Sequence, residues 1–518
     1  MISSALALYH RWLAAAWTKN PKLGLGMIGS SVAITVLIGF AGPSAVALNL
    51  GPRESLLPPW YLPLRYANWN EWVVAGALWL GISMGVAGLW VCWRANKEGW
   101  HAPGWKLFGL GAGLSTATCL VLPMTSADVL MYAAYGRLQA IGQNPYDITP
   151  AMIFRQAFDP VLIYTERPWQ DTPSVYGPVA SASQWLAATL GGQNMHDVVF
   201  WLQLMALLPF LVIGLVALRM TKADPVRQTR AVLFTVLNPL LIWAVLAGAH
   251  NEALTLVFAV LGLMFLRRYP LLAGIGIGLA GTVKVSLVFY GIAMLWGYRR
   301  DWRKLLLLGV GAAIPLLLAY GLWAPQALLA AQRNTGYVSN GSWAAPVLSL
   351  LSLVFGQPNA HWFVTHVSWV LMAAVAWMLS RTLPWKAAPG VEDGQCRNDS
   401  LTIAARTAVI LTTAWLLTSP YTLSWYDLII WVPLGMLASS KLDSVLMWRG
   451  TWLSLAYVTG RAYQFSDEML FTSAAIRDVI CAGVQIAVVA AIVIWWWRDG
   501  HELPPLRGLL QRRLVKRS

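Results

Sequence analysis

Long apolar segments recur along the chain, and they constrain its fold more than any other feature. Segments of about twenty apolar residues are long enough to cross the hydrocarbon core of a bilayer as helices. Only 11% of the residues are charged, whereas soluble domains have about 25%. The sequence therefore predicts an all-α polytopic membrane protein. The segments lie near residues 24–47, 72–93, 105–124, 198–219, 229–248, 252–267, 304–322, 361–380, 401–419, 425–439, 449–460 and 474–497.

Two further apolar stretches do not fit a single span. The stretch 271–298 is too long and carries Lys284 in its middle. We expect two shorter helices that meet near Lys284, because a helix break at membrane depth is tolerated where protein or a water-filled cavity surrounds it. Residues 344–357 are short enough to be re-entrant. The bundle should therefore hold about 12–14 helices by the length rule.

Charge predicts how the bundle is oriented. The net charge of +15 comes from basic residues in short connections, which is the pattern of cytoplasmic loops. We attribute it to topology and to attraction for anionic membrane lipid, and we expect no nucleic-acid partner. Ala45-Val46-Ala47 resembles a signal-peptidase site, but the length of the first segment favours an uncleaved anchor. The parts expected in the cytoplasm are both termini, the connections 94–106, 219–230, 267–268 and 299–304, a polar, mobile loop at 381–400 and the basic tail 498–518.

The polar features of the chain fall on the opposite, extracytoplasmic face. We expect one transmembrane domain, residues 1–518, whose active site is formed around an extracytoplasmic loop at 125–197. Within that loop, 128–139 and 179–190 have the composition of short surface helices, and Gly142 and Pro145 end the first of them. The other polar segments on this face are 248–252, the break at Lys284, 325–343, 419–427 and 461–468.

Several kinds of chemistry have no support in the sequence. The four cysteines show no spacing typical of disulfide or zinc sites. No nucleotide-binding or metalloprotease motif is present. We therefore expect no metal and no soluble cofactor.

Asp128 is the first candidate for catalysis, because a carboxylate next to a span is costly and is by default a functional hypothesis. It could act as a general base on a hydroxyl. It could equally cap the helix that follows, as could Ser126, and the spacing alone leaves both interpretations open. Tyr132 lies one helical turn further on, where it can share a face with Asp128.

Three more groups of polar residues are candidates for binding. His250, Asn251 and Glu252 form either a polar turn, in which Asn251 caps the next helix, or a site for sugar hydroxyls or phosphate. Lys284 either snorkels or faces an anion, and its distance from the basic loops favours the anion. Tyr421, Trp425 and Tyr426 follow Ser419-Pro420, and an interfacial aromatic turn is the simpler explanation for them. The residues interpreted as solvated loop charges are Glu166, Arg167, Asp171, Arg461, Asp467 and Glu468.

Six short motifs, in this order, resemble those of actinobacterial polyprenol-phosphate-mannose-dependent α-1,6-mannosyltransferases of the GT-C glycosyltransferase superfamily. They cover roughly residues 120–430. The clearest departure is Glu252, where the family has aspartate. The motifs are Asp128-Val129-x-x-Tyr132, Gly142-x-Asn144-Pro145-Tyr146, Tyr176-Gly177-Pro178, His250-Asn251-Glu252, Gly278-Leu279-Ala280-x-x-x-Lys284, and Ser419-Pro420 with Trp425-Tyr426.

The resemblance implies a GT-C-type helix bundle with surface helices above a lateral lipid cavity. It implies transfer of mannose, with inversion, from polyprenyl-phosphate-mannose to a mannoside of a growing lipomannan or related glycolipid. Asp128 matches the catalytic aspartate, and Lys284 matches a position expected to meet the lipid phosphate. The resemblance also implies that His250, Asn251 and Tyr426 line the sugar pocket, and that Tyr132, Tyr146, Tyr176, Glu252, Tyr421 and Trp425 belong to the substrate site.

A transporter or flippase for a lipid-linked sugar is the main alternative. Transporters often have internal repeats with broken helices in corresponding halves, whereas the break at Lys284 has no convincing partner in the other half. The same enzyme class with another polyprenyl-phosphate sugar as donor is a second alternative, because Glu252 departs from the family pattern.

Overall fold

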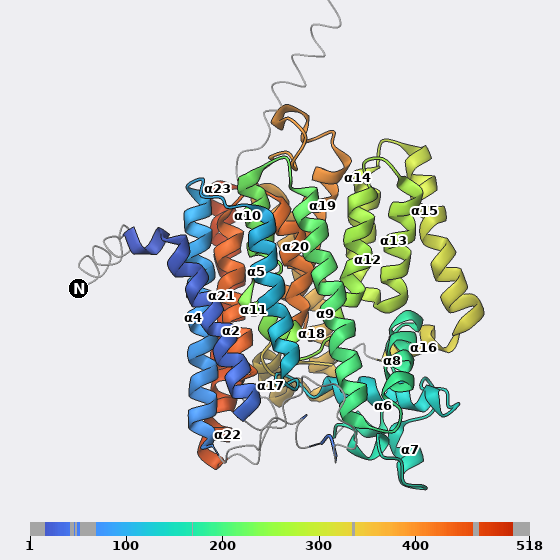
Figure 1. Cartoon of the computed structure of the whole chain (residues 1–518). Coiled ribbons are helices and arrows are strands. Elements are labelled where there is room, and N and C mark those ends of the chain that lie inside the picture. The colour runs from blue at the N-terminus through green and yellow to red at the C-terminus, as the bar shows by residue number, and fades with distance from the viewer. Residues whose placement is uncertain are drawn as a thin grey trace, which may run out of the picture.

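The computed structural model describes residues 16–41, 46, 49–51, 69–167, 169–333, 337–458 and 466–500. Every regular element in these ranges is helical, so the prediction of an all-α polytopic membrane protein is confirmed. Figure 1 shows the helices standing roughly side by side in one bundle. Ala45, Ala47, Arg461 and the tail 501–518, for which the sequence made predictions, lie outside the described residues.

Within the described ranges, seven helices are long and apolar enough to cross a membrane. They are α2 (Pro21–Ala41), α4 (Glu71–Lys97), α9 (Met195–Met220), α15 (Trp302–Leu316) with its π-helical extension, α18 (Gln357–Thr382), α19 (Ser400–Thr418), and α22 (Asp467–Ala474) continued by α23 (Ala482–Asp499). Shorter helices complete the bundle: α5 (Gly104–Ala117), α10 (Pro225–Leu233), α11 (Pro239–Leu241), α12 (Glu252–Phe265), α13 (Pro270–Val283), α14 (Val288–Gly297), α20 (Leu428–Met436) and α21 (Lys441–Ala456).

The break at Lys284 is present where the sequence placed it. Lys284 has extended backbone, with φ −153° and ψ 129°, between α13 and α14. The helices α12, α13 and α14 have only 14, 14 and 10 residues, too few for a full span. At the lower end of the bundle in Figure 1, α8 (Pro178–Gly191) contacts α13, and α6 (Asp128–Ala140) contacts α8. These two are the predicted surface helices, and α7 (Pro150–Phe154) lies between them in the chain.

Basic connections and polar segments lie at opposite ends of the bundle. In Figure 1 the α9–α10 connection and the loop after α18 are at the upper end, whereas α6, α7 and α8 are at the lower end. The loop after α18 is tied to its neighbours: Arg267 pairs with Asp399 at 2.8 Å, and Arg406 donates to the carbonyl of Leu383 at 2.8 Å. These contacts hold the two ends of the loop, and its mobility stays a prediction. Which end faces the cytoplasm stays a prediction.

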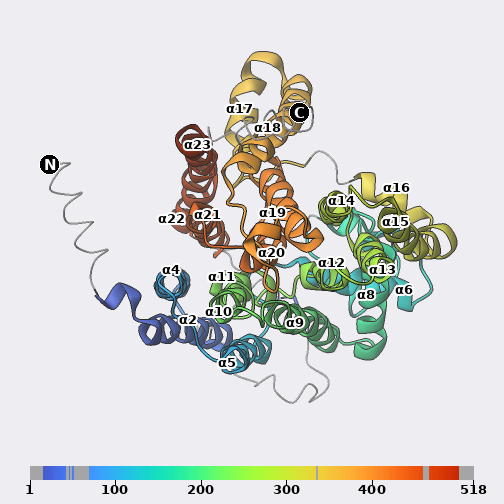
Figure 2. The same cartoon turned by 90° about the horizontal axis from the view of Figure 1, so that it is seen from above.

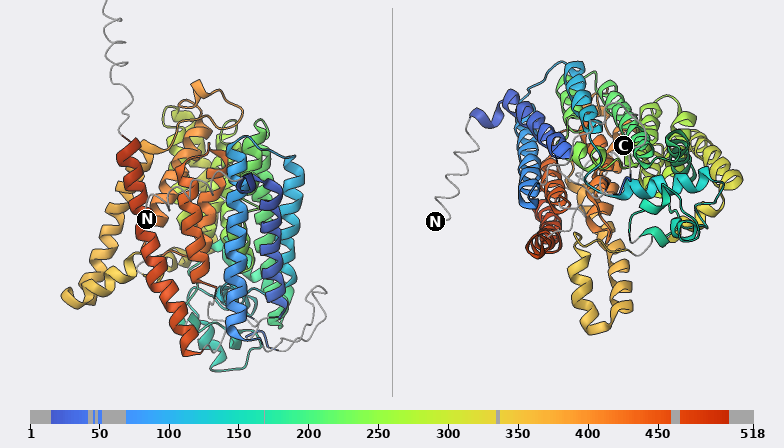
Figure 3. Two further views of the ribbon diagram at one scale, coloured as in Figure 1. Left: turned by 90° about the vertical axis from the view of Figure 1, so that its left-hand side faces the viewer. Right: turned by 60° about the horizontal axis from the view of Figure 1, so that its bottom comes forward.

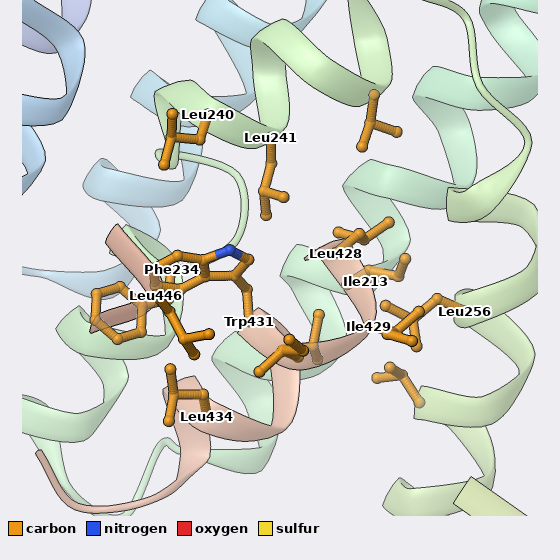
Figure 4. Close-up of a cluster of buried hydrophobic side chains, with 14 of the residues drawn as sticks. Ile213, Phe234, Leu240, Leu241, Leu256, Leu428, Ile429, Trp431, Leu434 and Leu446 are labelled. Atoms are coloured by element: carbon orange, nitrogen blue, oxygen red, sulfur yellow. The ribbon is translucent and has the colours of Figure 1, made fainter. Parts of the chain in front are cut away.

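The core of the bundle contains large apolar side chains and a buried ion pair between α10 and α21. Figure 4 shows Trp431 of α20 packed beside Phe234 and below Leu240 and Leu241, and the rings of Trp431 and Phe234 are 5.0 Å apart, edge to face. Both residues are essentially inaccessible to solvent. Close by in the chain, Arg230 of α10 makes two bonds of 2.7 and 2.8 Å to Asp443 of α21. A bidentate geometry of this kind offsets the desolvation of both charges.

The helical hairpin α17 (Ala344–Phe355) and α18 projects from the body of the bundle (Figures 2 and 3). Gly356 joins the two helices with φ +75°, a conformation that glycine adopts without strain. Along α17 only Ala344 is buried, and Leu353 is 85% exposed. This apolar, unpacked surface is what a segment in contact with lipid requires, and the sequence had marked 344–357 as a short re-entrant candidate.

Candidate functional site

Two cavities meet beside Asp128. The first, here called the Glu166 cavity, has a volume of about 450 Å³ and reaches Trp169 and Arg477. The second, the Lys284 cavity, has a volume of about 480 Å³ and reaches Trp369. The residues that line both cavities are Asp128, Val175, Tyr176, Tyr337, Tyr421 and Trp425.

Asp128 is the first residue of α6, and its side chain is 28% exposed. The Ser126 hydroxyl donates to Asp128 Oδ1 at 2.9 Å and accepts the Asp128 backbone N–H at 3.1 Å. Ala127 occupies the N-cap position, where no side chain makes a capping bond. The helix dipole favours an ionised carboxylate at this end. The structure thus favours the interpretation of Asp128 as a group that faces the cavities over its interpretation as a helix cap.

A layer of three rings lies behind Asp128. His250 Nδ1 is 3.6 Å from Asp128 Oδ2 and 3.4 Å from the Tyr132 hydroxyl. The imidazole stacks on Trp425 with centroids 3.8 Å apart. Burial and the charge of Lys284 lower the pKa of His250 well below its usual value. Because burial also raises the pKa of Tyr132 well above its usual value, both rings are neutral and support Asp128 without adding charge.

Lys284 lies at the break between α13 and α14 and faces two side chains and a cavity. Its ammonium pairs with Glu252, whose side chain is 3% exposed. It also lies 4.5 Å from the centroid of the Tyr426 ring, within the range of a cation–π interaction. The Lys284 side chain is 24% exposed, and Lys284 lines the Lys284 cavity. This arrangement is that of a fixed cation at a cavity wall, and it argues against snorkelling.

The turn Tyr176-Gly177-Pro178 joins α8 to the end of α13. The Gly177 N–H donates to the Val283 carbonyl at 3.1 Å, next to Lys284. Tyr176 packs edge to face on Tyr132, with centroids 5.2 Å apart. The turn therefore connects the part of the site that holds Asp128 with the part that holds Lys284.

Replacement of Gly177 by alanine should disturb this connection. An alanine Cβ would lie 2.2 Å from the Thr282 carbonyl oxygen, so the backbones must separate. We expect a loss of about 1–3 kcal/mol in the free energy of unfolding, measured as a lower thermal midpoint in detergent. Gly113→Ala in α5 is the control, because its Cβ would meet nothing within 4 Å. Equal midpoints for the two variants would contradict the close contact.

The turn 419–427, which carries three predicted site residues, is held by a buried arginine. Arg449 of α21 is 0% exposed and donates to the Thr422 hydroxyl at 2.6 Å and to Gln485 at 3.0 Å. It also lies 3.1 Å from Asp427. Buried charges within a membrane bundle need such partners. Arg449 thereby fixes the backbone on which Trp425 and Tyr426 stand.

Arg449→Lys should show that the shape of the guanidinium matters as well as its charge. Lysine can still pair with Asp427, but it cannot reach both Thr422 and Gln485 with a rigid fork. The lost bonds should lower the free energy of unfolding by about 1–3 kcal/mol, again measured by the thermal midpoint. Arg498→Lys, at the exposed end of α23, is the matched control. A thermal midpoint equal to that of Arg498→Lys would mean that the bonds from the guanidinium to Thr422 and Gln485 do not stabilise the fold.

The structure places most of the predicted site residues together, with four exceptions. Those that line one or both cavities are Asp128, Tyr132, Tyr176, Lys284, Tyr421, Trp425 and Tyr426. His250, Asn251 and Glu252 do not line either cavity. His250 and Glu252 lie behind the walls formed by Asp128 and Lys284, with 0% and 3% exposure. Tyr146 is also separate: its hydroxyl donates to Ser181 of α8 at 2.9 Å in a small apolar cluster with Tyr320.

Sequence reasoning missed the far wall of the Glu166 cavity. The interpretation of Glu166 as a solvated charge is wrong, because the residue is 6% exposed and lines the cavity. Asp171 and Arg155 do form an exposed surface pair, at 2.7 Å. The signal that could have found Glu166 is Trp169 three residues later, because a tryptophan in the middle of a long loop needs a surface to pack on.

Across the described ranges, no three His, Cys, Asp or Glu side chains gather closely enough to hold a metal ion. The expectation that the reaction uses no metal stays a prediction.

Comparison with known proteins gives a consistent result. A family model for the N-terminal domain of alpha-(1->6)-mannopyranosyltransferases matches residues 24–299. A probable alpha-(1->6)-mannopyranosyltransferase of Mycolicibacterium smegmatis is 31% identical over 147 residues, which are 28% of this chain and 26% of that protein. An alpha-(1->6)-mannopyranosyltransferase of Mycobacterium tuberculosis is 30% identical over 167 residues, 32% of this chain and 26% of that protein. The matches thus span only about a quarter of these relatives (26% of each).

A longer match at lower identity covers more of the chain. Alpha-(1->6)-mannopyranosyltransferase A of Mycobacterium tuberculosis is 23% identical over 366 residues, which are 66% of each protein. No solved structure matches this chain.

Proposed function

The chain belongs to the alpha-(1->6)-mannopyranosyltransferase family, and from this membership we propose that it is a membrane mannosyltransferase. The donor is polyprenyl-phosphate-mannose, and the acceptor is a mannoside of a lipomannan or related lipoglycan. The reaction forms an α-1,6 linkage with inversion at the anomeric carbon. The observation that carries the proposal is the position of Asp128, where the two cavities meet.

The geometry suits an inverting transfer. Inversion requires the acceptor hydroxyl and the leaving group on opposite faces of the sugar, with a base beside the hydroxyl, as in inverting glycoside hydrolysis. Asp128 lies between one cavity that contains Lys284 and another that does not. A donor sugar at the junction would present its anomeric carbon to an acceptor hydroxyl held by Asp128. The proton of that hydroxyl would pass to the carboxylate as the new C–O bond forms and the bond from the anomeric carbon to the phosphate oxygen breaks.

The Lys284 cavity suits a lipid phosphate. A phosphate monoester of polyprenol leaves as an anion, so it needs a cation and no acid, and a fixed cation stabilises the charge that develops on it. The cavity is also lined by Val285 and Trp369, which are 58% and 59% exposed. Apolar side chains exposed on a membrane protein face lipid. A polyprenyl chain could therefore leave the cavity between α14 and α18 without entering water.

The remaining predictions on topology belong to the same proposal. The end of the bundle with α6, α7 and α8 faces away from the cytoplasm, and the termini and basic connections lie on the cytoplasmic side. Residues 125–197 form the extracytoplasmic catalytic loop of a single domain. The protein resides in the cell membrane, in contact with anionic lipid.

A transfer assay tests the proposal. Purified protein in detergent is given polyprenyl-phosphate-mannose and a short α-1,6-mannoside, and an elongated mannoside with a new α-1,6 bond is the expected product. Product with a different polyprenyl-phosphate sugar only would change the donor. Protein that forms no product with such donors, yet moves a lipid-linked sugar across liposomes, would be a transporter instead.

A further inference from the structure

The Glu166 cavity does not have Lys284 in its wall, and segments far apart in the chain build it together with α6 and the turn 419–427. Glu166 and Trp169 come from the loop between α7 and α8, and Tyr337 comes from the segment before α17. Tyr457 follows α21, and Arg477 belongs to the π-helical turn Ala475–Cys481. Its volume, about 450 Å³, is in the range of small-molecule sites, roughly 300–1,000 Å³.

The carboxylate of Glu166 determines which ligands suit this cavity. It is 6% exposed and belongs to the cavity wall. A carboxylate only accepts hydrogen bonds, so it is complementary to hydroxyl groups. An anionic ligand would meet both Glu166 and Asp128. Arg477, which also lines the cavity, pairs with Asp478 at 2.6 Å. The carboxylate oxygens in the described wall therefore favour a ligand that offers hydroxyl groups.

Aromatic rings lead from the far wall of the cavity to the catalytic junction. Trp169 and Tyr337 are edge to face with centroids 5.6 Å apart, and Tyr337 and Tyr421 are 6.3 Å apart. Tyr421 lines both cavities beside Asp128. The backbone of the loop that carries Trp169 is anchored to α6, because the Tyr135 hydroxyl donates to the Thr172 carbonyl at 2.9 Å. Rings set in a row with polar groups between them provide stacking surfaces for the apolar faces of successive sugar units.

We propose that the Glu166 cavity is the binding site for the acceptor glycan, and this inference rests on the proposed transferase function. Glu166 accepts hydrogen bonds from hydroxyls of a mannose unit near the growing end, and Trp169 and Tyr337 pack on its sugar rings. The terminal mannose then reaches the junction, where its 6-hydroxyl meets Asp128. Glu166 and Trp169 are thus acceptor-binding residues, separate from the groups that hold the donor.

Glu166→Gln tests this assignment, because it keeps the shape of the side chain and removes its charge. We expect the KM for an α-1,6-mannobioside acceptor to rise by about ten- to a hundredfold, with an unchanged KM for polyprenyl-phosphate-mannose. Asp171→Asn, an exposed carboxylate in the same loop and outside both cavities, should leave both values as in the wild type. An acceptor KM within twofold of the wild-type value would overturn the assignment.

A binding measurement separates this inference from the proposed function. Saturation-transfer NMR with α-1,6-mannobiose and no donor should detect binding to the wild-type protein and to Asp171→Asn, and a signal reduced at least tenfold for Glu166→Gln. If Glu166→Gln does not fold, Trp169→Leu serves as the second variant with the same expectation. If mannobiose binds but the protein transfers no sugar, the proposed function is rejected and the assignment of the cavity to the acceptor is retained. If transfer occurs and is insensitive to both substitutions, the proposed function is retained and the assignment of the cavity to the acceptor is rejected.

Discussion

Replacement of Asp128 by asparagine is expected to lower the turnover number by about 100- to 10,000-fold, the usual range for loss of a general base. Asparagine keeps the shape of the side chain and can still accept the bond from the Ser126 hydroxyl, which is 2.9 Å long in the wild-type protein. It cannot take a proton from an acceptor hydroxyl. The effect should therefore appear in turnover and much less in the KM for the donor, because Lys284 is untouched. The measurement is the transfer assay with both substrates varied.

Two comparisons make the result specific to Asp128. Asp147→Asn changes an exposed aspartate of the same loop that lines neither cavity, and it should leave turnover as in the wild type. The thermal midpoint of Asp128→Asn should stay close to that of the wild-type protein, because the carboxylate is 28% exposed. Turnover within tenfold of the wild-type value would remove Asp128 from the role of base and leave it as part of the junction wall only.

Much of the fold could be predicted from the length and hydropathy of the segments. The incorrect predictions share one cause. The predicted span at 401–419 corresponds closely to α19, and the predicted break at Lys284 separates α13 from α14. The predicted span at 449–460 is misplaced, because α21 begins at Lys441. Asp443 falls between the predicted spans 425–439 and 449–460. Asp443 is buried in a pair with Arg230, and the sequence cannot distinguish a paired buried charge from an exposed one.

In the site, too, the sequence did not distinguish polar residues that line a cavity from those that do not, and errors of both kinds occurred. The motifs predicted a shared site for Asp128, Lys284 and Tyr426, and all three residues line one cavity. Each of them lies at or near the end of a helical segment. The motif His250-Asn251-Glu252 looked like part of a binding surface, yet two of its side chains support the wall from behind. Glu166 looked solvated, yet it lines a cavity. Whether a polar residue forms the surface or supports it depends on packing between distant segments, which local sequence does not encode.

Replacement of Lys284 by methionine is expected to lower kcat/KM for the donor by about 100- to 1,000-fold, as for the loss of one well-placed electrostatic group. The single substitution is ambiguous, however, because it leaves Glu252 at 3% exposure without its counter-ion. An uncompensated buried charge destabilises a protein by about 3–5 kcal/mol. A lower rate could then reflect a damaged fold. Lys222→Ala, at an exposed connection of the other end of the bundle, controls for the loss of a lysine as such.

The double variant Lys284→Met with Glu252→Gln resolves the ambiguity, because it removes both buried charges together. Its thermal midpoint should return most of the way to the wild-type value, since an apolar or neutral replacement of a buried pair is often close to neutral in stability. Its activity should not return, because the cation that would meet the leaving phosphate is still absent. Recovery of stability without activity assigns Lys284 to the donor phosphate. Recovery of both would mean that Lys284 serves only as the counter-ion of Glu252, and that the charge of the leaving phosphate is stabilised by another group.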